Sequence, residues 1–258
     1  MNEILFNILI CFLAGMGAGL GTGFAGLSAA TVISPMLFTF LGVPSYDAIG
    51  IALASDVLAS AVSARIYAKN KCLDIKNGLV MMAGVLSMTV VASWLSSFVE
   101  SRTMGSFSVV MTLFLGVKFL VFPVASTRKA MAGESRAVRF FKSLVCGMAI
   151  GLVCGFFGAG GGMMMLFVLT MVLGYELKTA VGTSVFIMTF SAFTGAFSHF
   201  LISQPSQLDL LAMCIVFTLL WAQIGAKIAA KAETLTLNRI VGAIRTILGV
   251  SMLLVTYL

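Results

Sequence analysis

Charged residues are scarce in this chain, and two long stretches have none. Asp, Glu, Lys and Arg together form 10% of the 258 residues, whereas 60% are hydrophobic. No Asp, Glu, Lys, Arg or His lies between Glu3 and Asp47, or between Lys142 and Glu176. A soluble domain of this size needs far more polar surface. The composition therefore excludes a soluble globule and predicts a multi-pass protein of the lipid bilayer.

The chain also lacks the residue patterns of common catalytic and metal sites. It has one His, His199, and five Cys without a Cys-x-x-Cys spacing, so we expect neither a metal site nor a disulfide framework. The glycine-rich run at residues 158–162 does not end in the Gly-Lys-Ser/Thr of ATP-hydrolysing proteins. We therefore expect no enzyme and no cofactor. We interpret His199 as a residue of the membrane interface rather than a pH switch.

The net charge of +7 does not indicate a nucleic-acid partner, because the Lys and Arg residues occupy short loops between apolar segments. Counted over ten segments, one alternating set of loops holds thirteen Lys and Arg residues, and the other set holds only Arg102. The positive-inside rule then places both termini outside the cytoplasm, in a plasma or inner membrane. The first residues lack the basic leader of a secretory signal, so we expect them to stay in the membrane.

What the chain does contain is an internal repeat. Residues 19–50 align without a gap with residues 151–182, at a constant offset of 132, and ten of the 32 pairs are identical. Each copy places a glycine-rich break between two uncharged stretches, which is typical of discontinuous helices around the binding site of a secondary transporter. Five segments per copy would invert the second copy relative to the first.

We therefore predict an all-α polytopic membrane protein of two inverted repeats, each with a glycine-broken helical hairpin and three spanning helices. Residues 1–123 would form the N-terminal membrane repeat, residues 124–138 a cytoplasmic linker and residues 139–258 the C-terminal membrane repeat, all in one functional bundle. The legs of each hairpin either cross the membrane or re-enter it. Re-entrant legs would bring the two hairpin tips together inside the membrane.

Glycines and hydroxyl residues at the breaks are candidates for a binding site. Exposed backbone N–H groups at a glycine tip that precedes a helix favour an anion, although small residues also serve close helix packing. Ser28 either caps the following helix or contacts a ligand; Thr183 and Ser184 either bind an anion or bond within and between helices. The candidate substrate-binding residues are Gly23, Gly26, Ser28, Gly158, Gly160, Gly161, Gly162, Thr183, Ser184 and Arg245.

Asp56 lies inside an otherwise apolar segment, where a carboxylate is costly and usually functional. It is the candidate coupling residue: it either accepts a transported proton or neutralises a buried cation such as Arg65, Lys118 or Arg245. Arg245, in the last segment, either attracts an anionic substrate or extends its charge to the membrane interface.

The pattern GLxxGFFGxGGGMMM at residues 151–165, followed by AVGTS at residues 180–184 and a small-residue helix ending in His199, resembles the second half of the TauE/SafE family of sulfite exporters. The first half is similar but has Gly26-Leu27-Ser28-Ala29 after its break. The resemblance implies a permease for a small anion, such as sulfite, a sulfonate or another organosulfur compound. We expect alternating access, with proton coupling and a homodimer as further expectations. The alternative is an anion channel with apposed re-entrant hairpins.

Overall fold

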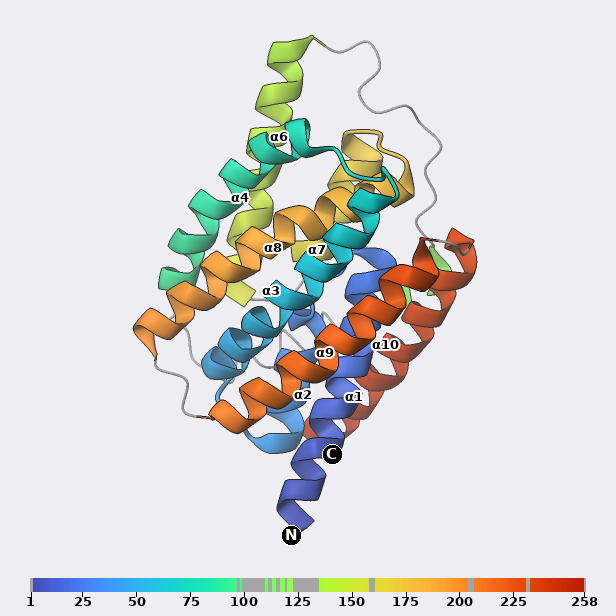
Figure 1. Ribbon diagram of the computed structural model, residues 1–258. Coiled ribbons are helices and arrows are strands. Elements are labelled where there is room, and N and C mark those ends of the chain that lie inside the picture. The colour runs from blue at the N-terminus through green and yellow to red at the C-terminus, as the bar shows by residue number, and fades with distance from the viewer. Residues whose placement is uncertain are drawn as a thin grey trace.

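Helices form along the apolar segments in the part of the chain that the structure describes. The computed structural model describes residues 2–96, 98, 110, 113–114, 117–118, 120–122, 135–157, 161–203, 207–230 and 233–257. Its helices are α1 (Asn2–Ala25), α2 (Ala30–Leu41), α3 (Ser45–Lys69), α4 (Ile75–Ser96), α6 (Arg136–Phe157), α7 (Gly161–Phe167), the π-helical turn η1 (Val168–Val172), α8 (Leu177–Ile202), α9 (Leu208–Ala229) and α10 (Thr234–Tyr257). Figure 1 shows them in one bundle, which confirms the predicted all-α class.

Within the described ranges, six helices are long and apolar enough to cross a bilayer: α1, α3, α4, α6, α8 and α9. The shortest of these candidate spans has 18 residues, or about 27 Å of helix, against a hydrocarbon core of about 30 Å. In contrast, α2 has only 12 residues, and its counterpart consists of seven α-helical residues followed by five π-helical ones. Each hairpin thus pairs one leg of spanning length with one short leg.

Helix boundaries in the two copies of the sequence repeat fall at the same offset. Helices α1 and α6 end at Ala25 and Phe157, and α3 and α8 begin at Ser45 and Leu177, both pairs at the offset of 132. In Figure 1, α1 runs up the view and α6 runs down it, while α3 and α8 lie side by side at the centre and run in opposite directions. Most of the last segment of the first half, residues 103–123, lies outside the described residues, as do residues 124–134 of the expected linker.

Two pairs of helices are packed closely through glycine. A Cβ atom on Gly19 or Gly23 of α1 would stand 2.6 Å from a backbone carbonyl oxygen of α9. Likewise, a Cβ on Gly84 of α4 would stand 2.6 Å from a carbonyl oxygen of α6, and Gly147 and Gly151 of α6 lie against the backbone of α4. Such contacts require small residues. Each close pair, α1 with α9 and α4 with α6, therefore joins one helix from each half of the chain.

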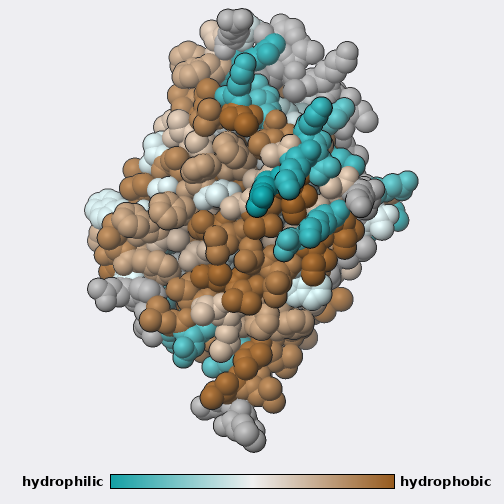
Figure 2. Space-filling view, viewed as in Figure 1, coloured by the Kyte–Doolittle hydropathy of each residue, from teal (hydrophilic) through white to brown (hydrophobic). Residues whose placement is uncertain are grey.

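The face of the bundle seen in Figure 2 carries a broad hydrophobic area, with hydrophilic side chains gathered mainly near one end. On the surface as a whole, large side chains such as Trp94 and Phe141 are more than half exposed, as expected for contact with lipid. Figure 1 places both termini at one end, opposite the connection from α3 to α4 and the start of α6. The termini and these basic segments therefore lie at opposite ends of the bundle.

Candidate functional site

The first hairpin breaks between α1 and α2 in a turn that the chain closes with its own hydrogen bonds. Gly26 has a φ of 61°, in the left-handed region that favours glycine. The hydroxyl of Thr22 lies 2.7 Å from the carbonyl oxygen of Leu27 and 3.0 Å from that of Ala18, so it can donate to either. Leu27 and Ser28 are buried, so this irregular backbone is covered by protein rather than lipid.

The second hairpin meets the first at this turn. Helix α6 ends at Phe157 and α7 begins at Gly161; Gly158 and Gly160 lie outside the described residues. A Cβ on Gly162 would stand 2.9 Å from the carbonyl oxygen of Gly26 and still closer to the amide nitrogen of Ser28. The backbone at Gly162, in the first turn of α7, is thus in contact with the first break. We call this contact the tip junction, formed by residues 26–28 and Gly162.

Asp56 of α3 is joined to the tip junction. Its side chain is 1% exposed. The Ser28 hydroxyl donates to its Oδ2 at 2.7 Å, and the Ser60 hydroxyl donates to its Oδ1 at 2.9 Å. Ser28 also accepts a hydrogen bond of 3.3 Å from the amide of Ala30, the first residue of α2, whereas contact of Ser28 with a ligand stays a prediction. Arg65, considered from the sequence as a partner for Asp56, has an exposed side chain.

The two hydroxyls of α8 that were candidates have different surroundings. Ser184 lies against the first break, where its hydroxyl is 3.3 Å from the carbonyl oxygen of Gly26 and 2.9 Å from that of Val181. Thr183 instead accepts a hydrogen bond of 3.1 Å from the amide of Asp74, in the connection between α3 and α4. Both hydroxyls therefore take part in contacts within and between helices, and Ser184 alone reaches the tip junction.

The remaining candidates are more dispersed. Gly23 belongs to the last turn of α1, where its carbonyl accepts a 2.9 Å hydrogen bond from the Tyr67 hydroxyl. Gly161 begins α7. Arg245 belongs to α10, and its side chain lies outside the described part of the structure. Among the described residues, no three His, Cys, Asp or Glu side chains gather as a metal site.

The structure places polar residues near the site that the sequence did not single out. Ser60 follows Asp56 by four residues on one helix face, a spacing from which the contact could have been anticipated. Tyr67 gave no such signal, because its partner lies 44 residues earlier. His199 is 1% exposed and is buried against α3, where its ring centroid is 4.2 Å from that of Tyr46. The structure thus corrects the expectation of an interface residue: His199 lies within the protein.

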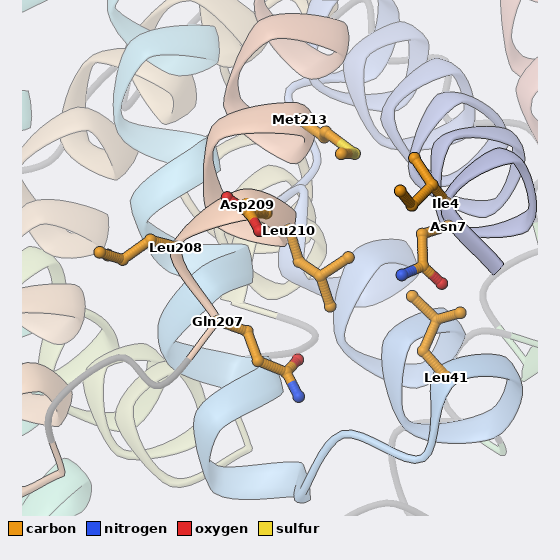
Figure 3. Close-up of a pocket in the computed structure, with 8 residues that line it drawn as sticks. All are labelled: Ile4, Asn7, Leu41, Gln207, Leu208, Asp209, Leu210 and Met213. Atoms are coloured by element: carbon orange, nitrogen blue, oxygen red, sulfur yellow. The ribbon is translucent and has the colours of Figure 1, made fainter. Parts of the chain in front are cut away.

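An open cavity of about 580 Å³ lies at the end of the bundle that carries the termini. It is bordered by the start of α1, the end of α2 and the start of α9. Figure 3 shows Asn7, Leu41 and Leu210 turned toward a common space. Since α2 begins at the tip junction and ends at Leu41, about 18 Å of helix separates the junction from this cavity. The lining residues are Ile4, Asn7, Leu41, Gln207, Leu208, Asp209, Leu210 and Met213.

A second polar cluster lies at the opposite, basic end, around Asp74. The hydroxyl of Tyr175 and the side-chain amide of Asn77 each donate to Asp74 Oδ2 at 2.9 Å. Partial burial tends to raise the pKa of Asp74, but hydrogen bonds from Asn77, Tyr175 and the backbone bring that pKa below its ordinary value. Burial, together with the bond to Asp74, raises the pKa of Tyr175. The cluster joins the α3–α4 connection to the start of α8.

A helical membrane bundle in which two broken hairpins meet beside a buried carboxylate has the architecture of a secondary transporter. The chain belongs to the sulfite exporter TauE/SafE family, whose family model matches residues 11–252. This membership confirms the resemblance seen in the sequence. It also agrees with the expectation of a membrane transporter rather than an enzyme.

Curated relatives cover almost the whole chain. The chain is 28% identical to the probable membrane transporter protein YunE of Bacillus subtilis, over 93% of each chain. It is 23% identical to the probable membrane transporter protein YdhB of the same organism, over 85% of this chain and 88% of the relative. It is 22% identical to the probable membrane transporter protein MJ0441 of Methanocaldococcus jannaschii, over 98% and 97%. No solved structure matches this chain.

Proposed function

We propose that the protein moves a small anion across the cytoplasmic membrane by alternating access, and that the anion is sulfite, a sulfonate or another organosulfur compound. The observation that carries this proposal is the tip junction, where two broken hairpins meet in the protein interior beside Asp56. Family membership supports the substrate class. The proposed substrate site comprises Gly26, Ser28, Gly158, Gly160, Gly161, Gly162 and Ser184; Gly23, Thr183 and Arg245 stay predictions.

The charge balance at the tip junction favours an anion under one condition. Helices α2 and α7 both begin there, and the N-terminus of a helix carries roughly half a positive charge. Ionised Asp56, with one negative charge, offsets roughly two such helix ends. Protonated Asp56 leaves the junction positive. Proton binding to Asp56 would therefore favour anion binding. The proton and the anion would then cross the membrane in the same direction.

The moving parts would be two lobes rather than the two halves of the sequence. The close glycine contacts hold α1 to α9 and α4 to α6, so each close pair contains a helix from both halves. Helices α3 and α8 lie antiparallel and side by side, where a Cβ on Gly195 of α8 would stand 3.0 Å from the Leu53 side chain of α3. We propose that the α1–α9 lobe and the α4–α6 lobe rock about this central helix pair. The tip junction lies between them.

The orientation in the membrane follows from the same proposal. The opposite directions of α1 and α6, and of α3 and α8, support two inverted repeats. The basic loops lie at the end away from the termini, which supports a cytoplasmic basic end and non-cytoplasmic termini. The cavity near Asn7 would then open to the outside. We also propose that the membrane repeats are residues 1–123 and 139–258, and that the protein forms a homodimer.

Ligand binding and flux test this function directly. A ligand that binds the folded protein raises its apparent melting temperature. We expect purified protein to be stabilised selectively and saturably by sulfite or a sulfonate, in a panel with sulfate, thiosulfate, sulfoacetate, taurine, lactate and formate. Proteoliposomes should then show saturable flux and counterflow exchange of the same anion. Flux without saturation would indicate the channel instead, and the absence of both stabilisation and flux would refute the anion substrate.

A further inference from the structure

The connection between α3 and α4, residues 70–74, is packed on the start of α8 at the basic end of the bundle. A Cβ on Gly182 would overlap the carbonyl oxygen of Cys72, whose carbonyl carbon would be 3.0 Å away. The amide of Asp74 donates a hydrogen bond to the Thr183 hydroxyl at 3.1 Å. The backbone of the connection therefore touches the backbone of α8, an approach that a glycine at position 182 permits.

The packed connection lies next to the tip junction. Thr183 contacts the connection, and the next residue, Ser184, has its hydroxyl 3.3 Å from the carbonyl oxygen of Gly26. Tyr67, in the last turn of α3, donates to the carbonyl of Gly23, in the last turn of α1, at 2.9 Å. Adjacent residues of α8 thus contact the connection and the tip junction, and the end of α3 is bonded to the first hairpin beside its break.

A side-chain contact also holds the connection in this position. The Tyr175 hydroxyl, just before α8, donates to Asp74 Oδ2 at 2.9 Å, and the side-chain amide of Asn77 donates to the same oxygen at 2.9 Å. Hydrogen bonds to a carboxylate are stronger than those between neutral groups. The bond from Tyr175 joins the second half of the chain to the first. It therefore keeps the connection against the start of α8.

The equivalent connection at the other end, between α8 and α9, is arranged differently. Gly50 is 132 residues before Gly182, and within the described residues the three nearest atoms to a Cβ on it belong to side chains of α8. Ser203 donates to Asp47 Oδ1 at 2.9 Å, which joins this connection to the start of α3. Gln207, where the connection ends, borders the open cavity. One connection is thus packed backbone to backbone, whereas its counterpart borders an opening.

We infer that residues 70–74 are the gate on the basic side of the tip junction, and that Asp74 and Tyr175 are positioning residues that hold this gate closed in the conformation of Figure 1. The inference rests on the proposed alternating access, which requires one end to be closed while the other is open. The packed connection and the open cavity lie at opposite ends of the bundle. To open the basic end, the connection must leave Gly182 and the bond between Tyr175 and Asp74 must break.

The first experiment measures access to the tip junction from the basic side. Ser184→Cys places a thiol at the junction, and a charged, membrane-impermeant methanethiosulfonate is applied to membrane vesicles of each orientation. Labelling of residue 184 is measured by mass spectrometry of its peptide, so the native cysteines stay in place. Lys69→Cys, at an exposed position of the basic end, identifies the vesicles whose basic side faces the reagent.

Tyr175→Phe removes the hydroxyl that donates to Asp74 and keeps the ring. We expect residue 184 to be labelled about 10-fold faster from the basic side in this variant, because a hydrogen bond to a carboxylate is lost. Tyr46→Phe, at the opposite end, is the matched control: the Tyr46 hydroxyl has no partner within the described residues, so labelling should stay within about twofold of wild type. An unchanged rate in Tyr175→Phe, or an equal increase from both sides, would overturn the inference. No substrate is needed, so the result is readable if the protein carries a different solute.

The second experiment closes the gate covalently. Asp74→Cys and Tyr175→Cys are combined with Cys72→Ala, and the two new thiols are joined by a short bifunctional methanethiosulfonate. We expect the bridge to lower sulfite flux in proteoliposomes about 10-fold or more, with recovery after reduction. Bridged and reduced samples are the same protein, so a folding defect of the variant cancels. Undiminished flux in the bridged fraction would contradict the gate. Wild-type sulfite flux is measured alongside, so failure of the proposed function is seen separately.

Discussion

Gly162→Ala tests whether the contact at the tip junction is needed for the stability and the transport activity of the protein. The added Cβ would stand 2.9 Å from the Gly26 carbonyl oxygen, 0.5 Å inside the 3.4 Å at which ordinary contact begins, and nearer still to the Ser28 amide nitrogen. Both obstacles are backbone atoms, so the backbone at Gly162 must move away from residues 26–28. Overpacking of this kind costs about 1–3 kcal/mol. For a chain of this size, we expect the melting temperature to fall by about 2–12 °C.

The same change should reduce sulfite flux about 10-fold or more, because the proposed substrate-binding groups lie on the backbones that are forced apart. Gly225→Ala is the matched control. Its Cβ would lie 3.4–3.5 Å from its neighbours on α1, which is ordinary contact, so stability and flux should remain near wild type. Thermal unfolding in detergent and flux in proteoliposomes measure the two effects. Wild-type stability and flux in Gly162→Ala would refute the apposition of the hairpins.

Three further predictions concern charge and motion. Asp56→Asn should make anion flux independent of pH, because an amide cannot exchange a proton; a wild-type pH profile of flux in proteoliposomes would exclude Asp56 from coupling. The depressed pKa of Asp74 means that its carboxylate stabilises the fold above its ordinary value of 3.8 and ceases to do so as pH falls through the lower folded pKa. Wild type should therefore lose more melting temperature than Asp74→Asn on acidification below about pH 4, and equal losses would contradict this contribution. The thiols of Cys11 and Cys214 face each other within the α1–α9 lobe, so oxidative crosslinking of this pair should leave flux within about twofold of wild type; loss of flux in the crosslinked fraction would show that these helices move apart.

Much of the fold could be predicted because the repeat and the apolar segments are local properties of the sequence. Gly42 and Gly174 show this well. They are one of the ten identical pairs, and both have left-handed backbone, with φ of 64° and 71°, at the ends of the short legs. Only glycine adopts that conformation readily, so the residue type itself encodes the turn. The first break was predictable for the same reason, because Gly26 also has a left-handed backbone, with a φ of 61°.

The partners across the bundle could not be predicted from the sequence. The sequence placed Ser28 and Asp56 in separate segments 28 residues apart, and only the packing of α2 against α3 shows that they form one hydrogen-bonded unit. The pairing of α1 with α9 is of the same kind, because a glycine stripe shows that a close neighbour is needed but does not identify it. His199 was misjudged because position near a segment end says nothing about which side of the helix is covered.

The close pairing of α1 with α9 also sets an order of events during synthesis. About 180 residues separate the end of α1 from the start of α9, so at typical translation speeds α1 waits roughly 10–40 s for its partner. Only about 40 residues separate the end of α4 from the start of α6. The α4–α6 pair therefore assembles first, while the glycine face of α1 remains open to lipid until nearly the whole chain has entered the membrane.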